Sequence, residues 1–209
     1  MKIFLIRHGE TVDNVSGRIQ GWSGGTLTSR GVMQARLVGE YLKNIPCSYL
    51  YTSDLRRCTQ TTEQMVRSLP NIIVQKTLLL RERNWGIMQG KMYPDLVKLL
   101  QKHHQAYHVY TPSKAEPWEQ FLKRIFVCLK NIIKKHQKES AVIIVTSGGV
   151  SSVLIGMLLG KKFKNALALK QTQACINILN CAGRKITVEK KNYTGHLLGI
   201  KSKRRTPYI

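Results

Sequence analysis

Residues 1–10, MKIFLIRHGE, combine a short apolar run with a cation, an imidazole and a glycine. The run from Ile3 to Ile6 is typical of one buried strand in a parallel sheet. In open α/β sheets, ligands bind beyond the carboxyl ends of the strands. We therefore expect Arg7 and His8 to lie at the mouth of a crevice, where Gly9 lets the backbone turn and approach a ligand closely.

Two later segments repeat this arrangement of a strand followed by a turn and a helix. Residues 49–52 are predicted as a strand, and Arg57 lies in the first turn of the next helix. Residues 141–145 are predicted as a buried strand, with Ser147 at the turn that follows. The remaining pattern predicts helices over residues 28–43, 55–68, 116–136 and 148–159, a helical region from Pro94, an edge strand at 72–75, and a hairpin over 175–180 and 185–189.

The composition is that of one strongly basic α/β domain. A length of 209 residues suffices for a well-buried core, and no repeat or Pro/Gly/Ser-rich linker indicates a second domain. We predict a single domain over 1–209 with a basic tail at about 201–209. The 34 Lys and Arg residues against 11 acidic ones give a net charge of +23, which favours anionic partners. Because the basic residues are scattered, we expect only weak, non-specific nucleic-acid binding in addition to a small phosphorylated substrate.

Cysteine usage and hydropathy suggest where the protein works. The five cysteines are odd in number and contain no CxxC pair, so they indicate neither a disulfide framework nor a zinc knuckle. Arg7 interrupts the first apolar run too early for a secretory signal, and residues 150–159 are too short to span a membrane. We expect a cytoplasmic protein with no membrane partner, and Lys203-Arg204-Arg205 is a candidate nuclear address.

Three segments together resemble the motifs of the histidine phosphatase superfamily, also called the phosphoglycerate mutase-like family. They are residues 7–35, which begin with Arg7-His8-Gly9-Glu10, residues 53–61 (SDLRRCTQT) and residues 80–86 (LRERNWG). The resemblance covers nearly the whole chain. It implies an α/β fold, a three-layer sandwich in which helices flank a mostly parallel central sheet.

The resemblance also implies an activity. It is that of a phosphomonoester hydrolase that acts through a phosphohistidine on a small phosphorylated metabolite, without a metal or an organic cofactor. The short length and residues 80–86 are similar to the fructose-2,6-bisphosphatase (TIGAR-type) branch, and residues 5–14 are similar to fungal phosphoglycerate mutase-like proteins. The implied catalytic residues are His8, Glu82, Arg7, Arg57 and Ser147, and the implied substrate-binding residues are Arg7, Gly9, Asn14, Gln20, Gly21, Arg57 and Gly148.

The chemistry of these residue types suits phosphoryl transfer. A neutral imidazole nitrogen of His8 can attack phosphorus, and the planar forks of Arg7 and Arg57 match phosphate oxygens. Glu82 can protonate the departing alkoxide and then activate water. Glu10 is expected to hold the loop rather than to take part in the chemistry.

Position 147 departs from the family pattern. Residues 145–149, VTSGG, align with the segment in which the family places a second histidine, and here that residue is Ser147. A hydroxyl supplies less charge to the transferring group than an imidazolium, so we expect a rate loss of about 10²–10³. The chain is then a slow phosphatase, a phosphate- or nucleic-acid-binding pseudoenzyme, or a form altered at this position to trap ligand. A phosphoglycerate mutase is a further alternative.

His104 and His108 are spaced to share one helix face and to bind a metal there. No third ligand has a matching spacing, so we interpret them as a surface pair and predict no metal site.

Overall fold

Six strands form one sheet within the part of the chain that the computed structural model describes, residues 1–183 and 185–199. They are β1 (Lys2–Arg7), β2 (Tyr49–Ser53), β3 (Ile73–Thr77), β4 (Ala141–Thr146), β5 (Ile176–Ala182) and β6 (Lys185–Tyr193). Their order is β3-β2-β4-β1-β5-β6, with parallel pairing from β3 to β1 and antiparallel pairing of β5 with both its neighbours. The prediction of a mostly parallel sheet is confirmed. The basic tail predicted at 201–209 lies outside the described residues.

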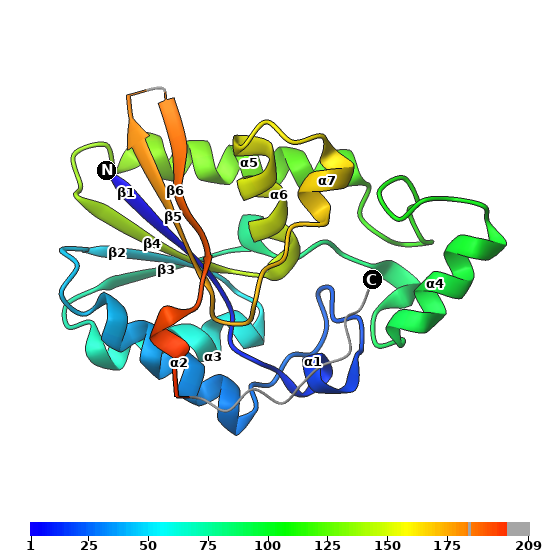
Figure 1. Ribbon diagram of the computed structural model, residues 1–209, viewed down its shortest axis with the longest axis horizontal. Helices are drawn as coiled ribbons and strands as arrows, with labels where there is room; N and C mark the ends of the chain where they lie inside the picture. Colours follow the sequence, from blue (N-terminus) through cyan, green and yellow to red (C-terminus); the bar gives the residue numbers. More distant parts are fainter. Residues whose placement is uncertain (184, 200–209) are drawn as a thin grey trace.

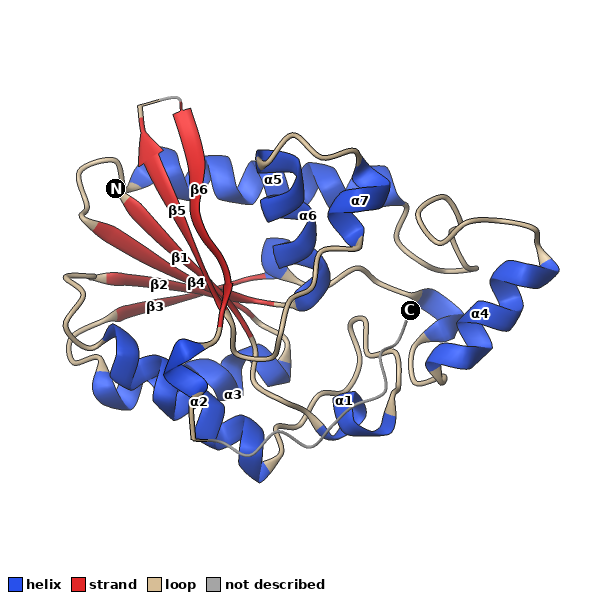
Figure 2. Ribbon diagram, viewed as in Figure 1, coloured by secondary structure: helices blue, strands red, loops and turns tan. Residues whose placement is uncertain are grey.

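Helices lie on both faces of this sheet (Figure 2). The α-helices are α1 (Val12–Ser16), α2 (Ser29–Leu42), α3 (Arg56–Met65), α4 (Tyr93–Lys102), α5 (Trp118–Lys135), α6 (Gly148–Leu158) and α7 (Phe163–Leu167), and the 3-10 turns are η1 (Val66–Ser68), η2 (Leu78–Leu80), η3 (Gly86–Met88) and η4 (Gly195–Leu197). Figure 1 shows α2 and α3 on one face and α5, α6 and α7 on the other, so the three-layer arrangement is confirmed. None of the helices within the described ranges has both the length and the apolarity needed to cross a bilayer.

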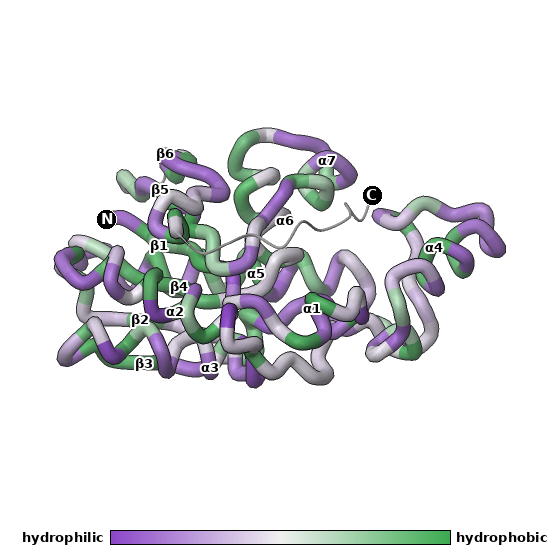
Figure 3. The backbone as a smooth tube through the Cα atoms, turned by 60° about the horizontal axis from the view of Figure 1, so that its bottom comes forward, coloured by the Kyte–Doolittle hydropathy of each residue, from purple (hydrophilic) through white to green (hydrophobic). Residues whose placement is uncertain are grey.

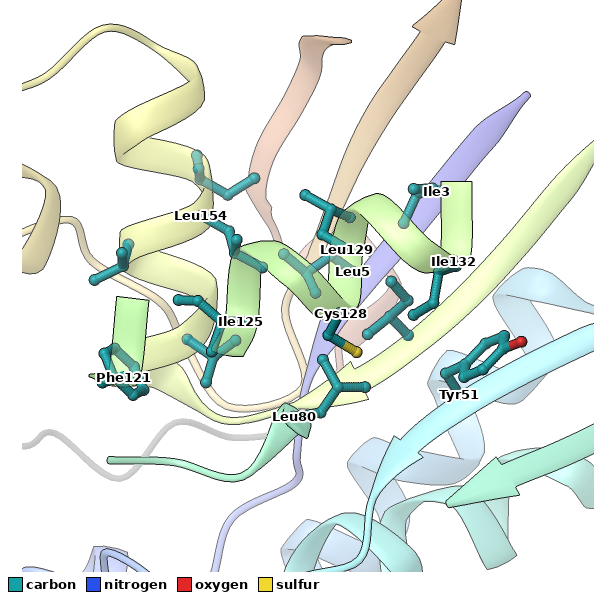
Figure 4. Packing of buried hydrophobic residues seen from close by; sticks show 14 of the residues in the cluster. Ile3, Leu5, Tyr51, Leu80, Phe121, Ile125, Cys128, Leu129, Ile132 and Leu154 are labelled. Carbon is teal, nitrogen blue, oxygen red and sulfur yellow. The ribbon is translucent and has the colours of Figure 1, made fainter. Parts of the chain in front are cut away.

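The core is divided between the two faces of the sheet because side chains alternate along each strand. Ile3 and Leu5 of β1 belong to the cluster under α5 and α6, whereas Phe4 and Ile6 belong to the cluster with α2 and α3. Figure 4 shows the first cluster, with side chains of α5 pointing onto the sheet. All six residues of β4 are buried, and Figure 3 colours this strand as hydrophobic. The apolar runs that predicted β1 and β4 therefore reflect burial on both faces.

The predicted elements occur close to their expected bounds. Thr28 caps α2, since its Oγ1 accepts a hydrogen bond from the backbone N–H of Gly31 at 3.0 Å. The expected edge strand is β3, and the expected hairpin is β5 with β6. Two five-residue helices, α1 and α7, were not predicted because one turn of helix shows no apolar periodicity.

The chain between β3 and α5 extends the molecule beyond the carboxyl ends of the strands. Figure 1 places α4 there, away from the sheet. This segment and the sheet edge enclose the cavity described below.

Candidate active site

The carboxyl ends of β1, β2 and β4 open into a cavity of about 390 Å³. His8 follows β1, Arg57 lies in the first turn of α3 after β2, and Gly148 and Gly149 begin α6 after β4. All four line the cavity, as do Arg7 and Glu82. The sheet thus brings together residues that are far apart in the sequence, as the strand-turn-helix pattern predicted.

His8 has the protonation state that a nucleophile requires. Its side chain is 2% exposed, and its Nδ1 lies 2.8 Å from the carbonyl oxygen of Gly9. Because a carbonyl oxygen only accepts, Nδ1 carries the proton and Nε2 keeps its lone pair. Burial lowers the pKa of His8 well below its ordinary value, and the charges of Arg57 and Arg7 lower it further. The imidazole is therefore neutral near pH 7.

The two arginines present positive charge to this cavity. Arg57 is 1% exposed and makes no ion pair with any described residue; its Nη2 donates to the carbonyl oxygen of Gly21 at 2.7 Å. Its Nε is buried without a hydrogen-bond partner in the described structure. Arg7 donates from Nη1 to the carbonyl oxygen of Gln171. The buried guanidinium of Arg57, which has no carboxylate partner among the described residues, is costly unless an anion joins it, so the site suits a phosphate group.

Glu82 is held in the cavity by two backbone N–H groups. Its Oε2 accepts from Gly149 at 2.9 Å and its Oε1 accepts from Arg83 at 2.8 Å. A Cβ atom at position 149 would collide with this carboxylate, so a larger residue there would displace it. Glu82 lines the cavity, whereas Arg81 and Arg83 do not.

Arg124 of α5 hydrogen-bonds to the backbone of the segment that carries Glu82. Its guanidinium donates to the carbonyl oxygens of Leu79 at 2.9 Å, Arg81 at 2.6 Å and Glu82 at 2.8 Å. It also forms a two-point ion pair with Glu116, at 2.6 and 2.8 Å. This residue was missed because nothing in a helical sequence shows which backbone carbonyls an arginine will reach.

Ser147 stands at the N-cap of α6, directly after β4. It is 1% exposed, and its Oγ has no hydrogen-bond partner in the described structure. It does not line the cavity, although Gly148 next to it does. The Ser147 hydroxyl is therefore covered by protein atoms and does not form part of the cavity wall.

The loop after β1 supplies one wall of the cavity. Asn14, Gln20 and Gly21 line it, as expected for substrate-binding residues. Gly9 does not line it; a Cβ atom there would collide with the backbone of Gly31. Glu10 accepts hydrogen bonds from Thr28 at 3.1 Å and Arg30 at 3.2 Å, which is the loop-holding role expected of it.

The expectation that His104 and His108 could share a helix face is wrong. The helix α4 ends at Lys102, and His104 has a φ of 51°, in the left-handed region, so the chain turns before His108. No group of three metal-ligating side chains occurs in residues 1–183 and 185–199. All five cysteines lie in those ranges, and all are free thiols.

Sequence reasoning did not find the second half of the cavity lining. Trp118 was predicted as a core residue from its helical spacing; it does pack in the core, and it also lines the cavity. The other lining residues on this side are Trp85, Tyr93, Leu96, Tyr107, Leu167, Leu169, Gln171 and Gln173. The only available signal was the density of aromatic residues between positions 85 and 118.

Comparison with known proteins identifies the family. The family model of the histidine phosphatase superfamily (branch 1) matches residues 3–194. Phosphoglycerate mutase-like protein 4 of Arabidopsis thaliana is 33% identical over 71% of this chain and 67% of its own. The metal-independent phosphoserine phosphatase of the same plant is 29% identical over 95% of this chain and 84% of its own.

A solved structure shows the same fold. The phosphoglycerate mutase from Bacillus anthracis superposes with a TM-score of 0.85 at 25% identity, covering 94% of this chain and 95% of that one. Together with the buried His8, the arginines and Glu82, these matches show that the chain belongs to the histidine phosphatase superfamily and is a phosphatase of that type.

Proposed function

We propose that this protein hydrolyses a small phosphomonoester through a phosphohistidine intermediate at His8, without a metal. The observation that supports this most strongly is the neutral imidazole of His8, whose Nε2 keeps its lone pair, in one cavity with the buried Arg57 and the half-buried Arg7. A positioned nucleophile beside cations that neutralise the phosphoryl oxygens is what this reaction requires.

In the first step, Nε2 of His8 attacks phosphorus and the bond from phosphorus to the alcohol oxygen breaks. Arg7 and Arg57 neutralise the phosphoryl oxygens, and protonated Glu82 gives its proton to the departing alkoxide. In the second step, Glu82 takes a proton from water as the water oxygen attacks phosphorus. The phosphorus–nitrogen bond breaks, releasing inorganic phosphate and regenerating neutral His8.

Ser147 makes this reaction slow in our proposal. Deleting one hydrogen-bond donor from a preorganised site typically lowers the rate by about 10²–10³. Ser147 does not line the cavity, so it does not supply the donor that a histidine would supply there. The alternative supported by this residue is a pseudoenzyme that binds a phosphate group without turning it over.

The test is a phosphatase screen with an adduct trap. The panel contains sugar phosphates, glycerate phosphates and phosphoserine, each assayed with EDTA, followed by an alkaline quench and peptide mass spectrometry, since phosphohistidine is stable to base. We expect turnover with EDTA present and an adduct on His8 that disappears in His8→Asn but not in the control His108→Asn.

Three outcomes would change the proposal. An adduct on Ser147 or on a cysteine would overturn the mechanism. Phosphate binding with no turnover and no adduct would establish the pseudoenzyme. Interconversion of phosphoglycerates without release of phosphate would establish a mutase.

A further inference from the structure

Beyond the phosphate end, the cavity continues into an apolar chamber. We define this chamber by the aromatic and leucine side chains that line it, and the uncharged polar side chains of Gln171 and Gln173 lie on the same side of the cavity. The aromatic and leucine residues are Trp85, Tyr93, Leu96, Tyr107, Trp118, Leu167 and Leu169. They come from α4 and the chain on either side of it, from the first residue of α5, and from the end of α7 and the residues that follow it. The phosphate end fixes where a phosphomonoester binds, so the alcohol part of the substrate is directed toward the remaining space.

The aromatic side chains of the chamber support one another. The ring centroids of Trp85 and Tyr107 lie 5.2 Å apart, and Trp118 lies 5.8 Å from both, edge-on to Trp85. The guanidinium of Arg83 lies 3.7 Å from the centroid of Trp118 and 4.6 Å from that of Trp85, but Arg83 does not line the cavity. These contacts fix the aromatic surface before a ligand arrives, which lowers the cost of binding.

One polar atom in this chamber has no partner. Trp118 is 9% exposed, and its Nε1 is buried without a hydrogen bond in the described structure. The side chains of Tyr93 and Tyr107, in contrast, hydrogen-bond to one another. An unpaired buried N–H costs free energy until an acceptor reaches it. This atom is covered by neighbouring protein atoms, so the indole presents its carbon surface to the chamber.

Charge in the cavity is confined to its other walls. Arg7, Arg57 and Glu82 form the phosphate end, and Asp13 and Arg18 lie on the α1 side, with Arg18 donating to the carbonyl oxygen of Gly90 at 2.9 Å. A second phosphate or a carboxylate placed in the chamber would lose water and gain no cation there. Such desolvation disfavours it.

We propose that the substrate is a phosphomonoester whose alcohol carries an uncharged aromatic or bulky apolar group. This inference rests on the proposed function for the position of the phosphate. It narrows the substrate class, because bisphosphates and phosphorylated carboxylic acids place a charge where the chamber offers none.

Binding can be tested without turnover. Methylphosphonate, 2-carboxyethylphosphonate and 3-phenylpropylphosphonate share a phosphate-like head that is not hydrolysed, and calorimetry gives their dissociation constants. We expect 3-phenylpropylphosphonate to bind about tenfold to hundredfold more tightly than methylphosphonate, because the phenyl ring leaves water. Equal affinities, or tightest binding of the carboxylate through Arg18, would overturn the inference.

Turnover provides a second readout. Propyl phosphate and 3-phenylpropyl phosphate release alcohols of similar acidity, so a difference in kcat/KM reports contacts of the ring rather than leaving-group chemistry. We expect a preference for the phenyl compound of about tenfold or more. If neither phosphate ester is hydrolysed although methylphosphonate and 3-phenylpropylphosphonate bind, the proposed function fails, and the binding data still test the chamber.

A matched pair of variants tests whether the chamber causes the preference for the phenyl phosphonate. Leu169→Gln puts an amide into the chamber and should reduce the preference for the phenyl phosphonate about tenfold, with little change for methylphosphonate. Leu159→Gln changes an exposed leucine at the end of α6 and should leave both affinities unchanged. Thermal unfolding checks that each variant is folded. An unchanged preference in folded Leu169→Gln would overturn the assignment of the chamber.

Discussion

At position 147 the chain carries a hydroxyl that is buried, unpaired and outside the cavity lining. Ser147→His would extend a donor from the same N-cap toward the phosphoryl group, and we expect kcat to rise about tenfold to a thousandfold, or about 1.4–4 kcal/mol. Steady-state kinetics on the best substrate of the screen measures the gain.

The matched control is Ser140→His, which adds the same side chain at an exposed position before β4. It should leave kcat unchanged. If Ser147→His is folded and binds phosphate, yet has no detectable turnover on any substrate, the slow-phosphatase proposal is wrong and the pseudoenzyme remains.

His196 makes stability depend on pH. Burial lowers its pKa to about 4, although its Nε2 lies 3.0 Å from the carbonyl oxygen of Ala174. An unfolded histidine takes up a proton near pH 6.5. The unfolded state therefore binds the proton first, and the free energy of unfolding falls as the pH drops from about 6.5 toward 4.

Replacing this histidine should weaken that dependence. We expect His196→Gln to lose less unfolding free energy than the wild type between pH 7.5 and pH 5, as measured by urea denaturation at both pH values. Some dependence remains, because burial also lowers the pKa of His8 and His136. His104→Asn, at an exposed left-handed position, is the control and should behave like the wild type. If His196→Gln loses as much unfolding free energy between the two pH values as the wild type does, the prediction is contradicted.

At the scale of elements, α5 positions the acid as well as covering the sheet. Arg124→Met removes three hydrogen bonds to the backbone of residues 79–82, and the carboxylate of Glu82 should then occupy several positions. We expect kcat to fall about tenfold to hundredfold while KM changes little, since the phosphate contacts of Arg7 and Arg57 remain. Steady-state kinetics separates the two constants.

Two further variants distinguish positioning from general stability. Arg124→Lys keeps the charge but not the fork, so its kcat should be intermediate. Arg36→Met removes an exposed arginine of α2 that donates to Gln64, and kcat should not change. A loss of thermal stability in Arg124→Met with unchanged kcat would assign Arg124 a structural role only.

For the whole molecule, the net charge of +23 is the dominant long-range property. We expect weak binding to single-stranded DNA that is independent of sequence and is lost at moderate salt, because binding releases counterions. Fluorescence anisotropy with an oligonucleotide and a scrambled control of equal length, each at several salt concentrations, measures the salt slope. Salt-resistant binding to only one of the two would instead favour a nucleic-acid-binding module.

The sequence by itself determined the elements and the catalytic end of the site. Apolar runs and helical spacing are local properties, so β1, β4 and α5 could be predicted from them. Because parallel strands bring their carboxyl ends together, the residues after β1, β2 and β4 were expected at one crevice, and His8 and Arg57 do line one cavity.

Only the tertiary structure decided which distant residues line the cavity and which side chains meet. Trp85 and Leu169 are separated by many residues, and nothing local indicates that they line one chamber. Arg124 reaches the backbone of Glu82 only because α5 packs beside that segment. The left-handed turn at His104, without glycine or proline to mark it, separated the histidine pair. Local pattern determines which residues form an element, whereas long-range packing determines which side chains meet.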